Sequence, residues 1–298
     1  TTANDNTAVG SQALKANTTG DKNVGIGASA LAANTTAQHN TAVGYHAMLA
    51  NTTGYNCVAV GKGALENNNV EGNTAIGYGA LNTNTTGNNN TAVGRDALDA
   101  NTTAGDNTAV GRSSLGANTT GTRNTAIGDI AAGAVTTGTD VTAVGWRALT
   151  ANTASENTAV GSRALDENTT GSRNVAMGDL SASGNTTGND VTAIGWNALR
   201  YSTGSSNTAV GSRSQDATTT GANNTSIGDL SLSANTTGGT NTAIGTQALY
   251  SNSTASNNVA VGYYTLYTNT TGTQNVGVGN RALAASTTGD YNTALGQD

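Results

Sequence analysis

One recurring position of this sequence carries the side chains most able to bind a ligand. The only two tryptophans, Trp146 and Trp196, stand 50 residues apart, and each follows a hydrophobic residue and a glycine. Aspartates and arginines recur with the same spacing in neighbouring repeats. Indole faces stack on flat ligands, while carboxylate and guanidinium groups make directed hydrogen bonds. The pattern predicts a glycan-binding edge formed by Trp146, Trp196, Asp129, Asp179, Asp229, Arg163 and Arg213.

The same spacing has a second explanation, which is duplication. Three successive repeats of 17, 17 and 16 residues form a unit that recurs every 50 residues. Duplication copies surface residues whether or not they bind anything, and single exposed aromatic residues are normal on protein surfaces. Both explanations stay open at the level of sequence.

The remaining residues form no catalytic or metal-binding pattern. His39 and His46 are seven residues apart and have no cysteine or carboxylate at metal-ligand spacing. The glycines recur at the repeat spacing, unlike the clustered glycines of a phosphate-binding loop. Cys57 stands where other repeats have asparagine and is expected at an exposed position. We predict that the chain is not an enzyme and has no cofactor and no metal site.

These candidate residues are positioned by a repeat that accounts for the whole chain. The repeat that begins as Asn6-Thr7-Ala8-Val9-Gly10 occurs 18 times, the last copy ending at Gly296, in steps of 17 residues that are interrupted by three steps of 16. A fixed period of this length is typical of a solenoid, in which each coil packs on the next. We predict one continuous β-solenoid domain over residues 1–298. Because atypical capping repeats are missing, we expect it to be a segment of a longer fibre protein.

Charge and hydropathy limit the classes of binding partner that the sequence predicts. The formal net charge is −6 and there is no basic patch, so the sequence gives no electrostatic reason to bind nucleic acid. No apolar run reaches membrane-spanning length, and we expect no membrane insertion.

Within a repeat, numbered from Asn6 as position 1, residues alternate as in a β-strand. Position 4 is Val or Ile in most repeats and position 2 is Thr or Val, so we expect both to face the core. Position 3 is always small, which indicates that something approaches the opposite face closely. We predict an oligomer interface there, formed by Ala8, Gly25, Ala42, Ala59, Ala75 and Ala92.

The rest of the repeat predicts a turn, a second strand and another turn. Position 5 is glycine in every repeat, so its backbone is expected to have φ > 0 or to pass close to a neighbour. Ala13-Leu14 and its equivalents are expected to begin a second strand whose leucine closes the core. Asn-Thr-Thr-Gly, as in residues 17–20, is expected to form a turn in which glycine is left-handed.

The threonine pairs of these turns carry two further hypotheses. Stacked pairs would form a regular threonine ladder similar to the arrays of ice-binding solenoids, although threonine is also simply a good turn residue. The same turns match the Asn-x-Thr acceptor of N-glycosylation.

The repeat resembles that of a known family. Asn-Thr-Ala-Val-Gly-x-x-Ala-Leu looks like the head repeat of YadA-type trimeric autotransporter adhesins and like similar repeats of trimeric phage tail fibres. The resemblance covers the whole chain, but the present repeat is longer in its Asn-Thr-Thr-Gly turn. It implies a left-handed parallel β-roll, three chains packed around a common axis, and display on a cell surface or virion. No single binding residue carries over.

Together these observations predict an all-β solenoid of 18 coils with about 17 residues and two short strands each. Its predicted function is that of a structural and adhesive extracellular fibre segment, a homotrimer that contacts surface glycans. The alternatives are a self-assembling extracellular filament subunit, which would grow through unpaired coil ends, and an ice-binding solenoid.

Overall fold

A computed structural model describes residues 2–297 of the chain, and it contains strands and turns but no helix in that range. The chain divides into two compact units, Thr1–Arg147 and Ala148–Asp298, and each unit is a β-solenoid. The solenoid class predicted from the period is therefore confirmed. The prediction that residues 1–298 form a single continuous domain stays a prediction.

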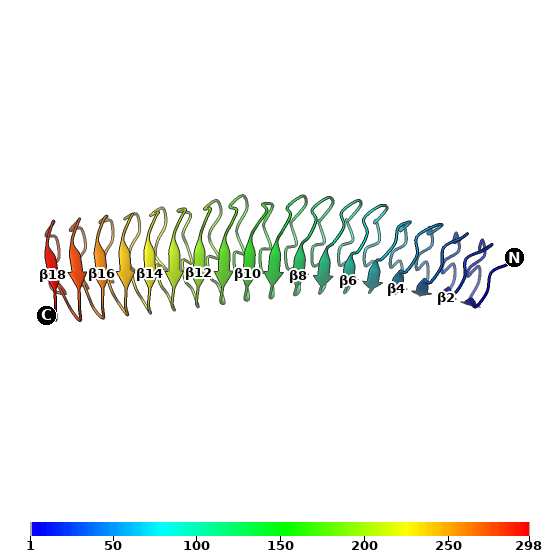
Figure 1. Ribbon diagram of the computed structural model, residues 1–298, viewed down its shortest axis with the longest axis horizontal. Helices are drawn as coiled ribbons and strands as arrows, with labels where there is room; N and C mark the ends of the chain where they lie inside the picture. Colours follow the sequence, from blue (N-terminus) through cyan, green and yellow to red (C-terminus); the bar gives the residue numbers. More distant parts are fainter. Residues whose placement is uncertain (1, 298) are drawn as a thin grey trace. The chain divides into compact units, whose positions relative to one another are not determined.

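Every coil contributes one strand of three residues, drawn as one arrow per coil in Figure 1. In the described part of unit 1 the strands are β1 (Thr7–Val9), β2 (Val24–Ile26), β3 (Thr41–Val43), β4 (Val58–Val60), β5 (Thr74–Ile76), β6 (Thr91–Val93), β7 (Thr108–Val110), β8 (Thr125–Ile127) and β9 (Thr142–Val144). In the described part of unit 2 they are β10 (Thr158–Val160), β11 (Val175–Met177), β12 (Thr192–Ile194), β13 (Thr208–Val210), β14 (Thr225–Ile227), β15 (Thr242–Ile244), β16 (Val259–Val261), β17 (Val276–Val278) and β18 (Thr293–Leu295).

Within each unit the strands pair in parallel and in register, each with the next along the chain. Ala42 of β3 lies opposite Ala59 of β4, and Ala59 lies opposite Ala75 of β5. The second pair keeps its register although the coil between Gly61 and Gly77 is one residue short. The deletion is absorbed in the turn, so each repeat position forms a straight row from coil to coil.

The faces of these strands are the reverse of the sequence-based prediction. Position 3 is buried, as at Ala42 and Ala92, whereas position 4 is partly exposed, as at Ile76 and Ile127. The predicted oligomer interface at Gly25, Ala42, Ala59, Ala75 and Ala92 is therefore wrong, because these residues face the interior of their own coil. Ala8, in the first coil, is exposed.

The interior of a coil lies between the strand, here called the strand wall, and the segment at positions 6 to 10, here called the turn wall. It is too narrow for large residues on both walls, and this explains the small side chains at position 3. The leucine at position 9 is buried, as predicted, but it packs against position 3 and not against position 4. In unit 2 one core cluster contains Leu232, Leu249 and Leu266 together with Ala248 of the same wall and Ala243 and Ala260 of the facing strands.

At one place in unit 2, a larger side chain on the turn wall is matched by a smaller one on the strand wall. Thr265 replaces the usual alanine at position 8, and the facing position 3 is Gly277. A Cβ on Gly277 would lie 2.7 Å from Cγ2 of Thr265, which is closer than real Cβ contacts. Glycine at this position therefore makes room for the larger threonine.

The second strand predicted at Ala13-Leu14 is not formed. Leu14, Leu31 and Leu65 have φ of 50°, 52° and 51°, and the residue two before each leucine is also left-handed. An extended strand requires negative φ, so this wall is a series of turns. It still bonds from coil to coil, for example from the amide of Leu31 to the carbonyl of Ala47 at 3.0 Å.

Both reasons expected for the glycine at position 5 are confirmed. Gly94 has φ of 134°, and a Cβ on it would lie 2.5 Å from the carbonyl oxygen of Gly111 in the next coil. The glycine of the Asn-Thr-Thr-Gly turn differs from the prediction, because Gly87 does not have a positive φ. Its backbone instead passes close to the next coil, where a Cβ would lie 2.0 Å from the carbonyl oxygen of Ala104.

A row of buried asparagines at position 1 connects successive coils. Asn107 donates its side-chain amide to the carbonyl of Gly121 at 2.9 Å. Its Oδ1 accepts the backbone N–H of Asn124 at 2.9 Å, and the amide N–H of Asn107 itself is donated to Asn90 at 3.0 Å. Each of these asparagines thus satisfies backbone groups that no strand can pair.

A second row of asparagines, at position 12, completes the network. Asn118 donates both to Oδ1 of Asn101 at 2.9 Å and to the carbonyl of Gly121 at 3.0 Å. Because these asparagines are buried in the turns, the glycosylation hypothesis is wrong for Asn34, Asn51, Asn84, Asn101 and Asn118.

Cys57 occupies one place in the position 1 row and is buried, in contrast to the exposed position expected from sequence. Its backbone N–H is donated to Asn40, as an asparagine there would do. Burial raises the pKa of the thiol above its ordinary value, so the neutral form is favoured.

We predict that Asn107→Ala destabilises unit 1, because it leaves the carbonyl of Gly121 with one donor fewer and the N–H of Asn124 without its acceptor. Loss of such buried bonds costs about 2–4 kcal/mol. Chemical denaturation of the variant measures the change. Asn88→Ala, at an exposed asparagine, is the matched control and should stay within about 0.5 kcal/mol of the original protein. Equal effects of the two variants would contradict the role assigned to the row of asparagines at position 1.

We predict that Gly277→Ala destabilises unit 2 by about 1–3 kcal/mol, because the added methyl group overpacks the core beside Thr265. The double variant Thr265→Ala and Gly277→Ala recreates the alanine pair of other coils and should recover most of that loss. Thermal unfolding of the two single variants and the double variant gives the coupling between the sites. Additive effects would show that the two walls do not compensate each other.

Candidate functional site

In unit 2, coil stacking brings the predicted edge residues onto consecutive coils. The amide of Arg213 is donated to the carbonyl of Trp196 at 2.8 Å, and the amide of Asn197 is donated to the carbonyl of Asp179 at 3.1 Å. The guanidinium of Arg213 lies 6.0 Å from the centre of the Trp196 ring. Asp179 and Asp229 are exposed on this edge, so it carries an exposed aromatic face with both charges beside it.

Other predicted edge residues are held by neighbours of their own. In unit 1, Arg112 binds both carboxylate oxygens of Asp129, at 2.7 and 2.8 Å. Trp146 is half exposed, and the guanidinium of Arg147 lies 5.6 Å from its ring. In unit 2, Arg163 donates to the buried carboxylate of Asp166 at 2.8 Å. The side chains of Asp129 and Arg163 are therefore engaged in structural ion pairs.

The threonine ladder is present, and half of it has a structural use. In several pairs the hydroxyl of the first threonine is donated to the next coil, as from Thr85 to the carbonyl of Thr102 at 3.0 Å and from Thr119 to that of Thr136 at 3.1 Å. The second threonine, such as Thr86 or Thr103, is exposed. Ice binding through this row stays a hypothesis.

An apolar row is exposed on the outer face of the strands. It comprises position 4 of every coil and is called the outer row below: Val9, Ile26, Val43, Val60, Ile76, Val93, Val110, Ile127 and Val144 in unit 1, and Val160, Met177, Ile194, Val210, Ile227, Ile244, Val261, Val278 and Leu295 in unit 2. Ile76 and Ile127 are 41% and 42% exposed, and Met177 is 43% exposed. The partly exposed Thr or Val of position 2 lies beside it.

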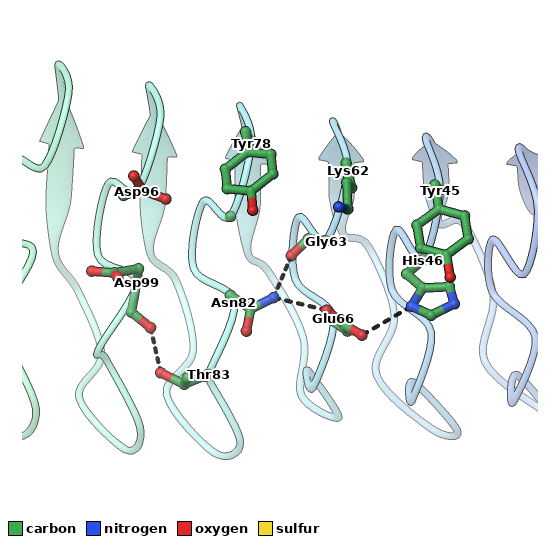
Figure 2. Close-up of a pocket in the computed structure, with 11 residues that line it drawn as sticks. Tyr45, His46, Lys62, Gly63, Glu66, Tyr78, Asn82, Thr83, Asp96 and Asp99 are labelled. Carbon is green, nitrogen blue, oxygen red and sulfur yellow. Dashed lines mark hydrogen bonds and ion pairs between the residues drawn. The ribbon is translucent and has the colours of Figure 1, made fainter.

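A hollow of about 270 Å³ lies on the opposite wall of unit 1, and Figure 2 shows its lining. Residues at positions 6, 7 and 10 of four consecutive coils surround it: Tyr45, His46, Lys62, Gly63, Glu66, Tyr78, Gly79, Asn82, Asp96 and Asp99, with Thr83 beside them. Tyr45 and Tyr78 lie along one rim with Lys62 between them, and Glu66 and Asn82 lie along the other.

Hydrogen bonds fix the polar rim of this hollow. Glu66 accepts Asn82 through Oε2 at 3.0 Å and contacts Nδ1 of His46 through Oε1 at 3.1 Å. The Asn82 amide is also donated to the carbonyl of Gly63 at 2.8 Å. The ammonium of Lys62 lies 5.9 and 5.5 Å from the ring centres of Tyr45 and Tyr78. These contacts hold the side chains of the rim in place.

The hollow exists because two consecutive coils have no side chain at position 7. Gly63 and Gly79 are the only glycines at that position in the sequence. Their φ values of 67° and 64° match the left-handed conformation that other coils adopt with larger residues. None of the ligand-binding residues predicted from the sequence lines this hollow. The signal in the sequence is glycine at position 7 of two successive repeats, as Lys62-Gly63 and Tyr78-Gly79.

At the acidic end of the hollow, burial and a neighbouring negative charge both disfavour ionisation of Asp99. Burial raises the pKa of the Asp99 carboxyl above its ordinary value, and the negative charge of Asp96 raises it further. Asp96 itself lies 3.4 Å from the guanidinium of Arg95. A ligand that donates hydrogen bonds to Asp99 would favour its ionised form.

Comparison of the chain with protein-family models, with curated proteins and with solved structures gave no match. Between residues 2 and 297, no helix has the length and apolar character required to cross a bilayer. The same residues contain no group of three or more His, Cys, Asp and Glu side chains placed to hold a metal ion.

We predict opposite pH dependences for two carboxylates of unit 1. Because the pKa of Asp99 is raised in the folded protein, the fold favours the protonated carboxyl over the ionised one. This contribution to stability is fully present below the unfolded-state pKa and is lost as the pH rises through the folded-state pKa. Asp99→Asn should therefore raise the melting temperature slightly at pH about 7 but not at pH about 3.

Asp140 is the matched control, because the hydrogen bond from Arg123 lowers its pKa. Its stabilising contribution is present above the unfolded-state pKa and is lost as the pH falls through the folded-state pKa. Asp140→Asn should lower the melting temperature slightly near neutral pH and leave it unchanged in acid. A shift of the same sign and size for both variants would refute the assignment.

Proposed function

We propose that the chain is a segment of an extracellular fibre in which identical solenoids associate side by side through the outer row. Its role is structural extension and adhesion, on a cell surface or a virion. The exposed apolar row carries this proposal. Large contiguous apolar surfaces on soluble proteins mark interaction sites.

The chemistry of the row favours a second copy of the same chain. Position 4 is apolar in every coil of both units, and it repeats at the spacing of the coils themselves. A partner with the same periodicity can match the row coil for coil, whereas an unrelated surface would match it at a few points. The resemblance to YadA-type heads and trimeric tail fibres implies three chains around one axis.

The residues that would stay exposed in the assembly support an adhesive role. When the outer row is covered by identical chains, the turn wall stays on the outside, with positions 6, 7 and 10 directed outward. That wall carries the exposed aromatic residues, such as Trp146 and Trp196. Aromatic side chains with polar neighbours are typical of binding surfaces.

We predict that the protein in solution has the mass of three chains over a range of concentrations. Ile76→Lys combined with Ile127→Lys should convert it to a single folded chain, because two charges would be buried in the interface. Light scattering measures the mass, and circular dichroism verifies the fold. Thr86→Lys combined with Thr137→Lys adds the same charge at exposed turns and should leave the trimer intact.

A monomer at all concentrations in the unchanged protein would overturn the proposal and favour a single-chain binder, including the ice-binding alternative. Mass that keeps growing with concentration would also overturn it, in favour of an end-to-end filament.

A further inference from the structure

We propose that the hollow between Tyr45 and Asp99 binds an uncharged oligosaccharide of hexopyranose units that lies across the coils of unit 1. This inference deepens the proposed adhesive function and rests on it, because it names the surface chemistry that the fibre would contact. It also moves the glycan site away from the tryptophan edge predicted from sequence.

The first argument is the room left by two glycines. A Cβ on Gly79 would lie 2.8 Å from Oδ1 of Asp96, and a Cβ on Gly63 would lie 3.1 Å from Nδ2 of Asn82. Side chains at these positions would thus occupy the hollow. Because the two glycines are in successive coils, the free space runs from coil to coil and suits an elongated ligand better than a compact one.

The second argument is the pair of tyrosines along the rim. Tyr45 and Tyr78 stand two coils apart, which is roughly 10 Å for stacked strands. Both are half exposed. Tyrosine presents an apolar ring to the C–H face of a pyranose and a hydroxyl to its polar edge. Lys62 lies between the two rings and offers ammonium donors to sugar hydroxyls.

The third argument is the supply of fixed hydrogen-bonding groups along the ligand path. The Glu66 carboxylate is oriented by His46 and Asn82, and it is still partly exposed. Asp96 and Asp99 lie at the far end of the hollow. Carboxylates and amides at such intervals accept and donate hydrogen bonds along a chain of hydroxyl groups, which is how a concave site gains specificity.

Charge selects against acidic glycans. The lining holds three carboxylates, those of Glu66, Asp96 and Asp99, against the single ammonium of Lys62. Sulfate, uronate or sialate groups would meet more negative than positive charge in this lining, and such repulsion disfavours the wrong ligand. Neutral and amino-substituted sugars meet no such barrier.

Binding of the full chain to immobilised neutral tetrasaccharides of glucose, N-acetylglucosamine, mannose and galactose tests the proposal, with hyaluronan tetrasaccharide and sialyllactose as acidic probes. We expect at least one neutral probe to bind, with a Kd of about 0.1–5 mM in titration. Acidic probes should bind at least about tenfold more weakly.

Two variants locate the binding site, and one is a matched control. Gly79→Asn fills the hollow and should abolish binding, while the coil tolerates it because Asn197 takes the same position with φ of 55°. Tyr78→Ala should weaken binding at least about tenfold. Tyr263→Ala removes an equally exposed tyrosine from unit 2 and should leave binding unchanged.

The proposal is overturned if no neutral probe binds, if Gly79→Asn binds like the original protein, or if acidic probes bind equally well. Light scattering on the same samples separates this result from the fibre proposal. A trimer without glycan binding refutes the site alone, whereas a monomer that binds the neutral probe refutes only the fibre.

Discussion

Buried asparagine side chains are the interaction on which each solenoid unit depends. A strand of three residues pairs only a small part of each coil, so most backbone groups lie in turns that have no sheet partner. Asn107 and Asn118 both donate to the carbonyl of Gly121, and Asn107 also accepts the N–H of the next coil. An unsatisfied buried peptide group is costly, so the amide ladders are what permits turns to be stacked as regularly as strands. Val135 and Val141 stand in place of asparagine at positions 12 and 1, and both are buried.

The narrowness of the coil determines what faces inward and what faces outward. Leucine from the turn wall fills the interior, which leaves room only for a methyl group or a hydrogen on the strand wall. Gly277 opposite Thr265 shows how closely the two walls are matched. The β-branched residues are therefore displaced to the outer face, where the outer row is exposed. The side-by-side association proposed above would cover this row.

Much of the variation between coils lies at positions 6, 7 and 10 of the turn wall, where it does not disturb the rows of asparagines. Positions 6, 7 and 10 project outward, so a coil can change them without a change in its core. Gly63 and Gly79 use this freedom to open a hollow, and Tyr45 and Tyr78 border it. In unit 2 the same positions present Trp196 beside Arg213. A regular scaffold with replaceable outer residues can acquire a binding site in a few coils only.

The sequence by itself determined the period, the solenoid class, the need for glycine at position 5 and the burial of the leucine, because each depends on local spacing or backbone conformation. It also marked Trp146 and Trp196 as exposed. The direction of the strand faces was decided only by the tertiary structure, since a two-residue alternation defines two faces but not which one is enclosed. The left-handed leucines, the buried asparagines and the hollow at Gly63 and Gly79 depend on contacts between residues one coil apart, which appear only when the coils are stacked.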